Sequence, residues 1–216
     1  PHNRALGGGC ELCLHADYVQ AHAELYMGLV EFGVGIIPAG GGTKEFARRA
    51  AEETSKSGID ELDALKSRYM TIATAQVSTS AWEAVELGYL DLKNAAIGIN
   101  RKRQLLAART KARELADTGY QPPVPENIRV LGRLGLGMFT VGASNMAAGN
   151  QISEHDGKIA EKLAWVICGG DLTAPSEVSE QYLLNLEREA FLSLCGERKT
   201  LERMQSILRG GKVLRN

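Results

Sequence analysis

The chain has 216 residues, a length that suits one ordinary domain, or one domain and part of another. Apolar residues make up 44% of it, enough for a buried core and too many for a disordered protein. The net charge of -1 does not favour nucleic acid or an anionic membrane as a partner. No apolar run approaches about 18 residues, so we expect no transmembrane helix.

The first four residues, Pro1-His2-Asn3-Arg4, contain no initiator Met and no secretory leader. A motif with candidate catalytic residues follows within ten residues, so we expect a chain that is truncated at its N-terminus. The four cysteines do not resemble a disulfide framework in a chain of this length. Cysteine usage therefore favours a reducing, cytoplasmic setting.

The first half of the chain predicts helices separated by glycine turns. We expect a helix from Glu11 to about His22, then a short extended piece with turns over 27–37. A glycine loop then leads into a helix for which Thr43 is the expected N-cap. Further helices are predicted over 60–74, over 80–88 with Ser80 as N-cap and Gly88 at its end, and over 100–117 with Leu105, Leu106 and Leu115 on its buried side.

The second half begins after a linker, "TGYQPPVPENI", which holds three prolines within four residues. The glycine-spaced stretch "LGRLGLGMFTVGASNMAAG" predicts a helix packed closely against a neighbour. Ile159, Leu163 and Ile167 continue at helical spacing until Gly169-Gly170. A long amphipathic helix, "PSEVSEQYLLNLEREAFLSLCG", and a shorter closing helix, "KTLERMQSILRGG", follow. The chain is therefore expected to be predominantly α-helical with a few short strands.

The stretch "ALGGGCELCLHAD" contains three consecutive glycines, Gly7, Gly8 and Gly9, at the expected start of a helix. Backbone amides at a helix start are unpaired and partly positive, and glycine leaves them uncovered. Such a turn can bind an anion or an oxygen that becomes one, although it can also serve only as a tight turn in close strand–helix packing.

Two glutamates accompany this turn in the sequence. Glu11 falls in the first helical turn, where the helix dipole alone could explain a carboxylate. Glu31 lies between Val30 and Phe32, in apolar company that makes a carboxylate costly unless it is paired or protonated. Two carboxylates in unlike environments form a reasonable acid/base pair, which spacing alone does not prove.

The stretch "ALGGGCELCLHAD", followed by "YMGLVEFGVGIIPAGGGTKEFARR", resembles the signature of the enoyl-CoA hydratase/isomerase (crotonase) superfamily. The match covers residues 5–49 and continues more weakly through "VSTSAWEAVELGYL" and the C-terminal helix pair. The Pro-rich linker and "ISEHDGKIAEKLAWVICGGDL" resemble the C-terminal part of two-part β-oxidation proteins that also carry a 3-hydroxyacyl-CoA dehydrogenase module. The resemblance implies an α/β fold of the ClpP/crotonase type, with a core part over 1–118, a linker over 119–128 and a helical region over 129–216 that covers the CoA site and supports oligomerisation.

The resemblance also implies roles for individual residues. Gly8 corresponds to an oxyanion-hole amide, Glu11 to the carboxylate that deprotonates water, and Glu31 to the carboxylate that exchanges the proton at the α-carbon. The presence of both glutamates implies hydratase chemistry on an acyl-CoA thioester, with no metal and no cofactor for hydration. Further substrate-binding positions implied by the resemblance are Gly7, Gly9, Pro38, Gly40, Gly41 and Lys212.

The same resemblance places the second oxyanion amide upstream of residue 1. We therefore expect this piece alone to be inactive, because losing one such donor typically costs about 100- to 1000-fold in rate. NAD would belong to an upstream dehydrogenase part of the parent. A homo-oligomer is expected, and an alternative assigns residues 124–216 to an interaction element without catalysis of its own.

Other motifs give weaker signals. Cys10-x-x-Cys13 near His15 and His22 suggests zinc or redox chemistry only weakly, because no second pair follows. "IIPAGGGTK" has Thr before Lys, the reverse of a nucleotide-binding loop. His155 precedes a predicted helix, so we expect capping or a surface position rather than ligation. Lys212 is compatible with CoA phosphates and equally with a solvated charge.

Overall fold

A computed structural model describes all of residues 1–216, which divide into two compact units. Unit 1 consists of Pro1–Leu29 and Gln76–Pro125, and unit 2 consists of Val30–Ala75 and Glu126–Asn216. One boundary falls inside the predicted Pro-rich linker. Residues 30–75 pack with the C-terminal part of the chain, so the units are not simply the two halves of the sequence. The functional division into core, linker and C-terminal region stays a prediction.

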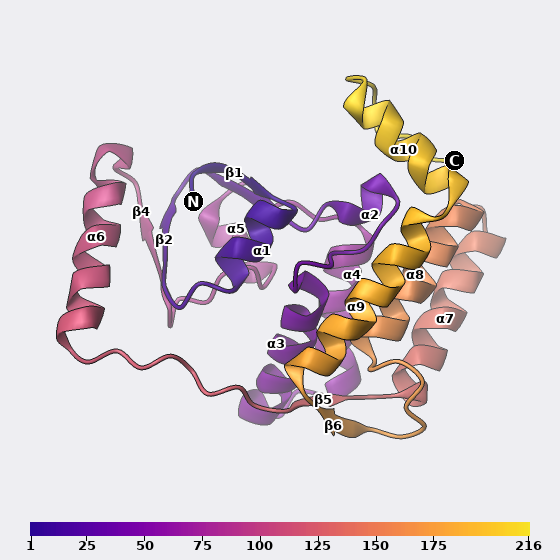
Figure 1. The fold of residues 1–216 in the computed structure, drawn as a ribbon, viewed down its shortest axis with the longest axis horizontal. Helices are drawn as coiled ribbons and strands as arrows, with labels where there is room; N and C mark the ends of the chain where they lie inside the picture. Colours follow the sequence, from indigo (N-terminus) through magenta and orange to yellow (C-terminus); the bar gives the residue numbers. More distant parts are fainter. The chain divides into compact units, whose positions relative to one another are not determined.

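Unit 1 contains two pairs of short parallel strands. β1 (Asn3–Leu6) pairs with β3 (Leu25–Gly28), and β2 (Val19–His22) pairs with β4 (Ala95–Gly98). Figure 1 shows β2 and β4 beside each other although more than 70 residues separate them in the sequence. Parallel strands require such long connections, which local sequence patterns do not reveal.

The helices of unit 1 are short apart from one. They are α1 (Gly8–Leu14), α5 (Ala81–Glu86) and α6 (Arg101–Asp117). The Ser80 side chain accepts a hydrogen bond from the Glu83 amide at the start of α5, and Gly88 follows its end with a φ of 78°. Both predicted signals for this helix are confirmed.

The predicted helix from Glu11 to about His22 is wrong beyond Leu14. His15 ends α1, and the backbone then extends to form β2. The Val19 amide donates to the Asn94 carbonyl at 2.9 Å, so a distant strand satisfies the backbone that a longer helix would have paired locally. Tertiary pairing therefore decides the structure of these residues.

The predicted burial of one face of α6 is also wrong. No residue of α6 is buried, and the side chains of Leu105 and Leu106 are 82% and 55% exposed, while Leu115 is half-buried. α6 contacts β2, and the Gln104 side-chain amide donates to the carbonyls of Gln20 and Pro1. A polar side chain thus makes the contact that the leucines were expected to make.

Unit 2 is mainly helical. Its helices are α2 (Glu31–Val34), α3 (Gly42–Ser57), α4 (Glu61–Ala73), α7 (Arg133–Ala148), α8 (Glu154–Ile167), α9 (Glu180–Cys195) and α10 (Arg198–Leu208). One antiparallel pair joins β5 (Ile128–Val130) to β6 (Ser176–Val178). α7, α8 and α9 run alongside one another in Figure 1.

The core of unit 2 is formed by apolar side chains of α3, α4, α7 and α8. The Tyr69 ring stacks on Phe139 with centroids 4.4 Å apart. A Cβ atom on Gly135 would lie 3.0 Å from the Cys168 sulfur, so a larger residue would not fit there without movement. The close packing predicted for the glycine-spaced helix is therefore confirmed at this position, as is the burial of Ile159, Leu163 and Ile167.

Two helix starts in unit 2 differ from the prediction. The N-cap of α3 is Gly41, with a φ of 99°, while the Thr43 hydroxyl donates to the Pro38 carbonyl at 2.8 Å. α9 begins later than predicted, because residues 176–178 pair with β5 and Ser179 caps the helix.

No helix in the structure combines the length and apolar character needed to cross a bilayer.

Candidate active site: a glycine turn and two glutamates

The glycine turn joins β1 to α1 in unit 1. Gly7 has φ 56° and ψ -128°, a conformation that side-chain-bearing residues rarely adopt, and it is the N-cap of α1. Its amide donates to the Gly28 carbonyl at 2.9 Å, which ties the end of β1 to the end of β3. Strand pairing therefore fixes the turn, and the turn opens a helix as the sequence predicted.

The surface of this turn carries exposed backbone beside a carboxylate. Gly8 and Gly9 are exposed, and a Cβ atom on Gly9 would meet nothing within 4 Å. A Cβ atom on Gly8 would lie 4.0 Å from Oε2 of Glu11, whose side chain is 9% exposed. First-turn amides have no partner inside their own helix and carry partial positive charge. A nearly buried carboxylate thus lies next to amides that can donate to an oxygen atom.

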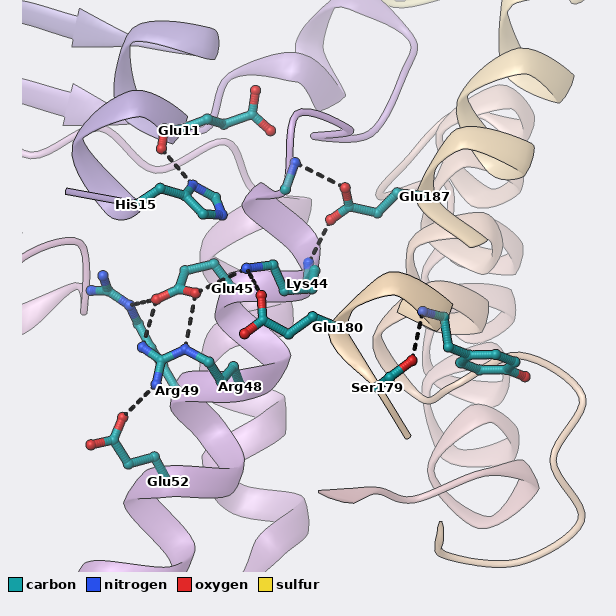
Figure 2. A network of polar contacts seen from close by, with 12 residues as sticks. Glu11, His15, Lys44, Glu45, Arg48, Arg49, Glu52, Ser179, Glu180 and Glu187 are labelled. Carbon is teal, nitrogen blue, oxygen red and sulfur yellow. Dashed lines mark hydrogen bonds and ion pairs between the residues drawn. The ribbon is translucent and has the colours of Figure 1, made fainter. Parts of the chain in front are cut away.

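The histidines near this turn bind backbone atoms. His15 Nδ1 lies 2.8 Å from the Glu11 carbonyl oxygen (Figure 2), and His22 Nε2 lies 2.9 Å from the Ile99 carbonyl oxygen. The Glu24 amide donates to the other ring nitrogen of His22. Both histidines therefore have structural roles.

Glu31 lies in unit 2 as the first residue of α2. Its side chain is half-buried, and the Oε2 atom is buried. α2 is a single turn that ends at Gly35, where φ is 98°. The Gly35 amide donates to the Phe32 carbonyl at 3.1 Å and the Ile36 amide donates to the Glu31 carbonyl at 3.2 Å, so backbone hydrogen bonds close this turn. The sequence expectation of a carboxylate in partly apolar surroundings agrees with this burial.

The loop that follows α2 is closed by an internal carboxylate. Glu187 on α9 is fully buried, and its two oxygens accept from the Gly41 amide at 2.9 Å and the Lys44 amide at 2.5 Å (Figure 2). Pro38 and Gly41 are buried, whereas Gly40 is exposed. The amides at the start of α3 are thus already bound to a protein anion, which removes them from a phosphate-loop role.

A buried ion network continues along α3. The Lys44 ammonium lies 2.9 Å from Glu180 and 3.4 Å from Glu45 (Figure 2). Burial raises the pKa of Glu45, but hydrogen bonds and charge from Arg48 and Arg49 outweigh it and lower that pKa to about 2. Glu45 is therefore a permanently charged structural residue and not a proton-transfer group near neutral pH.

Sequence reasoning missed Glu187, for which a signal was available. Leu183, Leu186, Ala190 and Leu194 form the buried stripe of α9, and Glu187 falls inside that stripe. A carboxylate on the apolar face of a helix must find donors, because an unpaired buried charge is too costly. The identity of those donors, two backbone amides of a glycine loop, depends on the packing of α9 against α3.

The remaining candidates have ordinary environments. Cys10 is buried and Cys13 half-buried in α1, and burial raises the pKa of the Cys13 thiol and of Cys168, to about 12 for the latter. The structure contains no group of three or more His, Cys, Asp or Glu side chains placed to hold a metal ion. Lys212 is exposed, and its carbonyl accepts from the Ser206 hydroxyl.

The expectation for His155 is wrong. His155 neither caps α8, which Ser153 does, nor lies on the surface, since its side chain is 3% exposed. Its Nε2 atom lies 2.9 Å from the Thr200 hydroxyl. The position before a helix suggested a surface residue, but α10 covers it in the folded unit.

Comparison with known proteins identifies the fold. The chain is 48% identical over all 216 residues to a Bacillus subtilis (strain 168) protein named "Probable 3-hydroxyacyl-CoA dehydrogenase". It resembles the crystal structure of carnitinyl-CoA hydratase from Mycobacterium avium with a TM-score of 0.51 and 19% identity, over 98% of this chain and 59% of that chain. The chain therefore has the crotonase-type fold of the enoyl-CoA hydratases. The fold class predicted from the glycine and glutamate motifs is therefore confirmed.

A second relative has a fatty-acid oxidation name. The chain is 29% identical over 209 residues, 95% of its length, to a Rickettsia felis protein named "Putative fatty acid oxidation complex trifunctional enzyme". It spans 27% of the Bacillus protein and 25% of the Rickettsia protein, about a quarter of each. No family model matches the chain. The chain thus corresponds to one segment of much longer relatives.

Proposed function

We propose that the chain supplies catalytic residues for the hydration of 2-enoyl-CoA thioesters. The observation that carries the proposal is the Glu11 carboxylate beside the exposed amides of Gly8 and Gly9. A carboxylate there can hold water, while the Gly8 amide donates to a thioester oxygen as it becomes an oxyanion. The half-buried Glu31 supplies the second acid/base group.

The proposed reaction balances as a simple addition. Glu11 takes a proton from water as the water oxygen bonds to C3 of the enoyl thioester, and the carbonyl oxygen becomes an enolate oxygen. The Gly8 amide stabilises that oxygen. Glu31 then donates a proton to C2, which restores the carbonyl and leaves a 3-hydroxyacyl-CoA. No electrons are exchanged, so the step needs no NAD, and the proposal assigns no role to a metal. Proton exchange with water then returns Glu11 to its ionised form and Glu31 to its protonated form.

The other binding positions follow from the same proposal. Gly7 and Gly9 shape the oxyanion turn, Pro38, Gly40 and Gly41 shape the loop after Glu31, and Lys212 contacts CoA phosphates. The longer relatives support a wider proposal, in which the parent protein also carries 3-hydroxyacyl-CoA dehydrogenase activity with NAD as its cofactor. We further propose that this parent is a cytoplasmic homo-oligomer and that residues 1–216 alone are inactive.

The test compares hydration of crotonyl-CoA by residues 1–216 and by the longer parent protein. In the parent, Glu11→Gln and Glu31→Gln should each lower kcat by about 100- to 10,000-fold, the usual contribution of a general acid or base. Glu86→Gln is the matched control, because Glu86 is an exposed glutamate of unit 1 outside the proposed site. Unchanged rates in both site variants would refute the assignment, and ordinary turnover by residues 1–216 would refute their inactivity.

A second candidate function is an interaction element in the C-terminal region. Leu134, Met138 and Val141 are 65%, 53% and 60% exposed and occupy one face of α7 at helical spacing. Deleting residues 124–216 should change the oligomeric state if this region holds subunits together. An assembly of unchanged size, measured by light scattering, would remove this candidate while leaving the hydratase proposal intact.

A further inference from the structure

The α2 helix is too short to hold its own shape. A single helical turn is unstable in isolation, because nucleation fixes several residues for few hydrogen bonds. α2 has four residues and no side-chain cap at its start. The orientation of Glu31, its first residue, must therefore be set by groups outside α2.

One such group is the Thr200 hydroxyl on α10. Thr200 is fully buried, and its Oγ1 donates to the Gly35 carbonyl at 2.8 Å. The same oxygen lies 2.9 Å from Nε2 of His155 on α8. A hydroxyl has one proton, and Gly35 receives it, so His155 Nε2 must be the donor in the second bond. Two buried hydrogen bonds thus link α2, α10 and α8.

The packing at this point leaves little room for movement. A Cβ atom on Gly35 would lie 3.0 Å from both Cα and Oγ1 of Thr200, so the two backbones approach as closely as glycine permits. The Ile36 amide, which belongs to the same peptide unit as the Gly35 carbonyl, donates to the Glu31 carbonyl at 3.2 Å. Hydrogen bonds therefore connect His155, Thr200 and the peptide unit between Gly35 and Ile36 to the backbone of Glu31.

We infer that Thr200 is a positioning residue, which fixes the end of α2 through the Gly35 carbonyl and thereby orients Glu31. The inference rests on the proposed hydratase function for its catalytic consequence, because Glu31 is the proton donor to C2 in that proposal. Displacing a catalytic group by about 1 Å can cost roughly 100-fold in rate without changing substrate binding. Loss of the hydroxyl should accordingly act on kcat and leave KM largely unchanged.

The experiment uses Thr200→Val, which preserves side-chain volume but removes both hydrogen bonds. In the parent protein with crotonyl-CoA, kcat should fall about 10- to 100-fold while KM changes by less than about threefold. Amide hydrogen exchange at residues 31–36 should accelerate at least about tenfold, since the anchor of α2 is lost. Thr200→Ser keeps the hydroxyl, so its kcat and its exchange rate at residues 31–36 should be close to those of the wild type. Thr200→Ala lacks the hydroxyl and should resemble Thr200→Val in both measurements. Neither variant has the methyl group, so the comparison isolates the hydroxyl.

Thr71→Val is the matched control for the substitution itself. Thr71 is also a buried threonine of unit 2, but its hydroxyl donates to Ser67 within its own helix. This variant should leave exchange at 31–36 unchanged. Equal exchange at 31–36 in Thr200→Ala and Thr200→Ser would overturn the inference.

The two proposals fail in different ways. A wild-type parent without hydration activity would refute the proposed function, and with it the catalytic consequence for Thr200. Exchange at 31–36 would still decide whether Thr200 fixes α2. Conversely, an active parent whose kcat and exchange are insensitive to Thr200→Val would refute the positioning role alone.

Discussion

Unit 1 and unit 2 stabilise their backbones in different ways. Unit 1 relies on two separate pairs of parallel strands, and its longest helix, α6, has no buried residue. Unit 2 buries a continuous set of helix faces and adds buried ionic groups at Glu45, Glu187 and Arg203. Parallel sheets normally have both faces covered, and isolated two-stranded sheets are marginal in water. We therefore expect unit 2 to be the more stable unit.

Each unit contains one tryptophan, which allows the comparison to be measured. Trp82 lies in α5 of unit 1 and Trp165 in α8 of unit 2. In a variant that retains only one of the two tryptophans, the fluorescence of that tryptophan reports on the unfolding of its own unit in denaturant. Coincident transitions in every variant below would contradict the division and indicate one cooperative unit.

The largest effect is expected for Arg203→Met. The buried Arg203 guanidinium donates to Asp156 and Asn216 at 2.8 Å each. Removing the cation leaves the nearly buried Asp156 carboxylate without its main partner, which typically costs about 3–5 kcal/mol. The free energy of unfolding reported by Trp165 should fall by about that amount. A loss under about 1 kcal/mol would show that Asp156 readily finds other donors.

A somewhat smaller effect is expected for Glu45→Gln. The pKa of Glu45 is about 2, below its ordinary value of 4.5, so the ionised form stabilises unit 2 by about 3 kcal/mol. This contribution is complete above pH 4.5 and is lost as the pH falls toward 2. The variant should be less stable than the wild type at neutral pH. Its unfolding free energy should also fall less than that of the wild type between pH 4.5 and pH 2. If the unfolding free energies of wild type and variant change with pH in parallel, the ionised form of Glu45 does not make this contribution.

The next effect concerns pH and His155. Burial, with the nearby Arg203 charge, lowers the pKa of His155 below 6.5, against the opposing influence of Glu197 and Asp156 and with a further contribution from Lys199. Below pH 6.5 the unfolded chain therefore binds a proton that the folded chain does not, so the stability of unit 2 falls on acidification. His155→Gln should flatten the pH dependence of the unfolding free energy reported by Trp165 below pH 6.5. If the variant keeps the wild-type dependence of unfolding free energy on pH, His155 is not the source of that dependence.

The smallest effect is expected for Leu105→Ala on α6. An exposed substitution of this kind usually changes stability by less than about 0.5 kcal/mol. Leu163→Ala is the matched substitution in unit 2, where the side chain is fully buried and its loss should cost about 2–5 kcal/mol. Similar losses of unfolding free energy in both variants would support the prediction from the sequence that one face of α6 is buried.

Helices in both units could be predicted where their signals are local. Ile159, Leu163 and Ile167 repeat at helical spacing, and Ser80 caps α5 through its own side chain. The strands could not, since β2 pairs with β4 across more than 70 residues and its local sequence continued a helical pattern. The leucines of α6 failed as a burial signal because spacing identifies a face without supplying a partner for it.

The sequence by itself determined the glycine turn, the fold class and the two glutamates as candidates, because each depends on a short contiguous motif. Only the tertiary structure revealed that Glu187 closes the start of α3 and that Thr200 and His155 anchor α2. These contacts join residues more than 40 positions apart, and a buried polar group selects its partner through packing and not through neighbouring sequence.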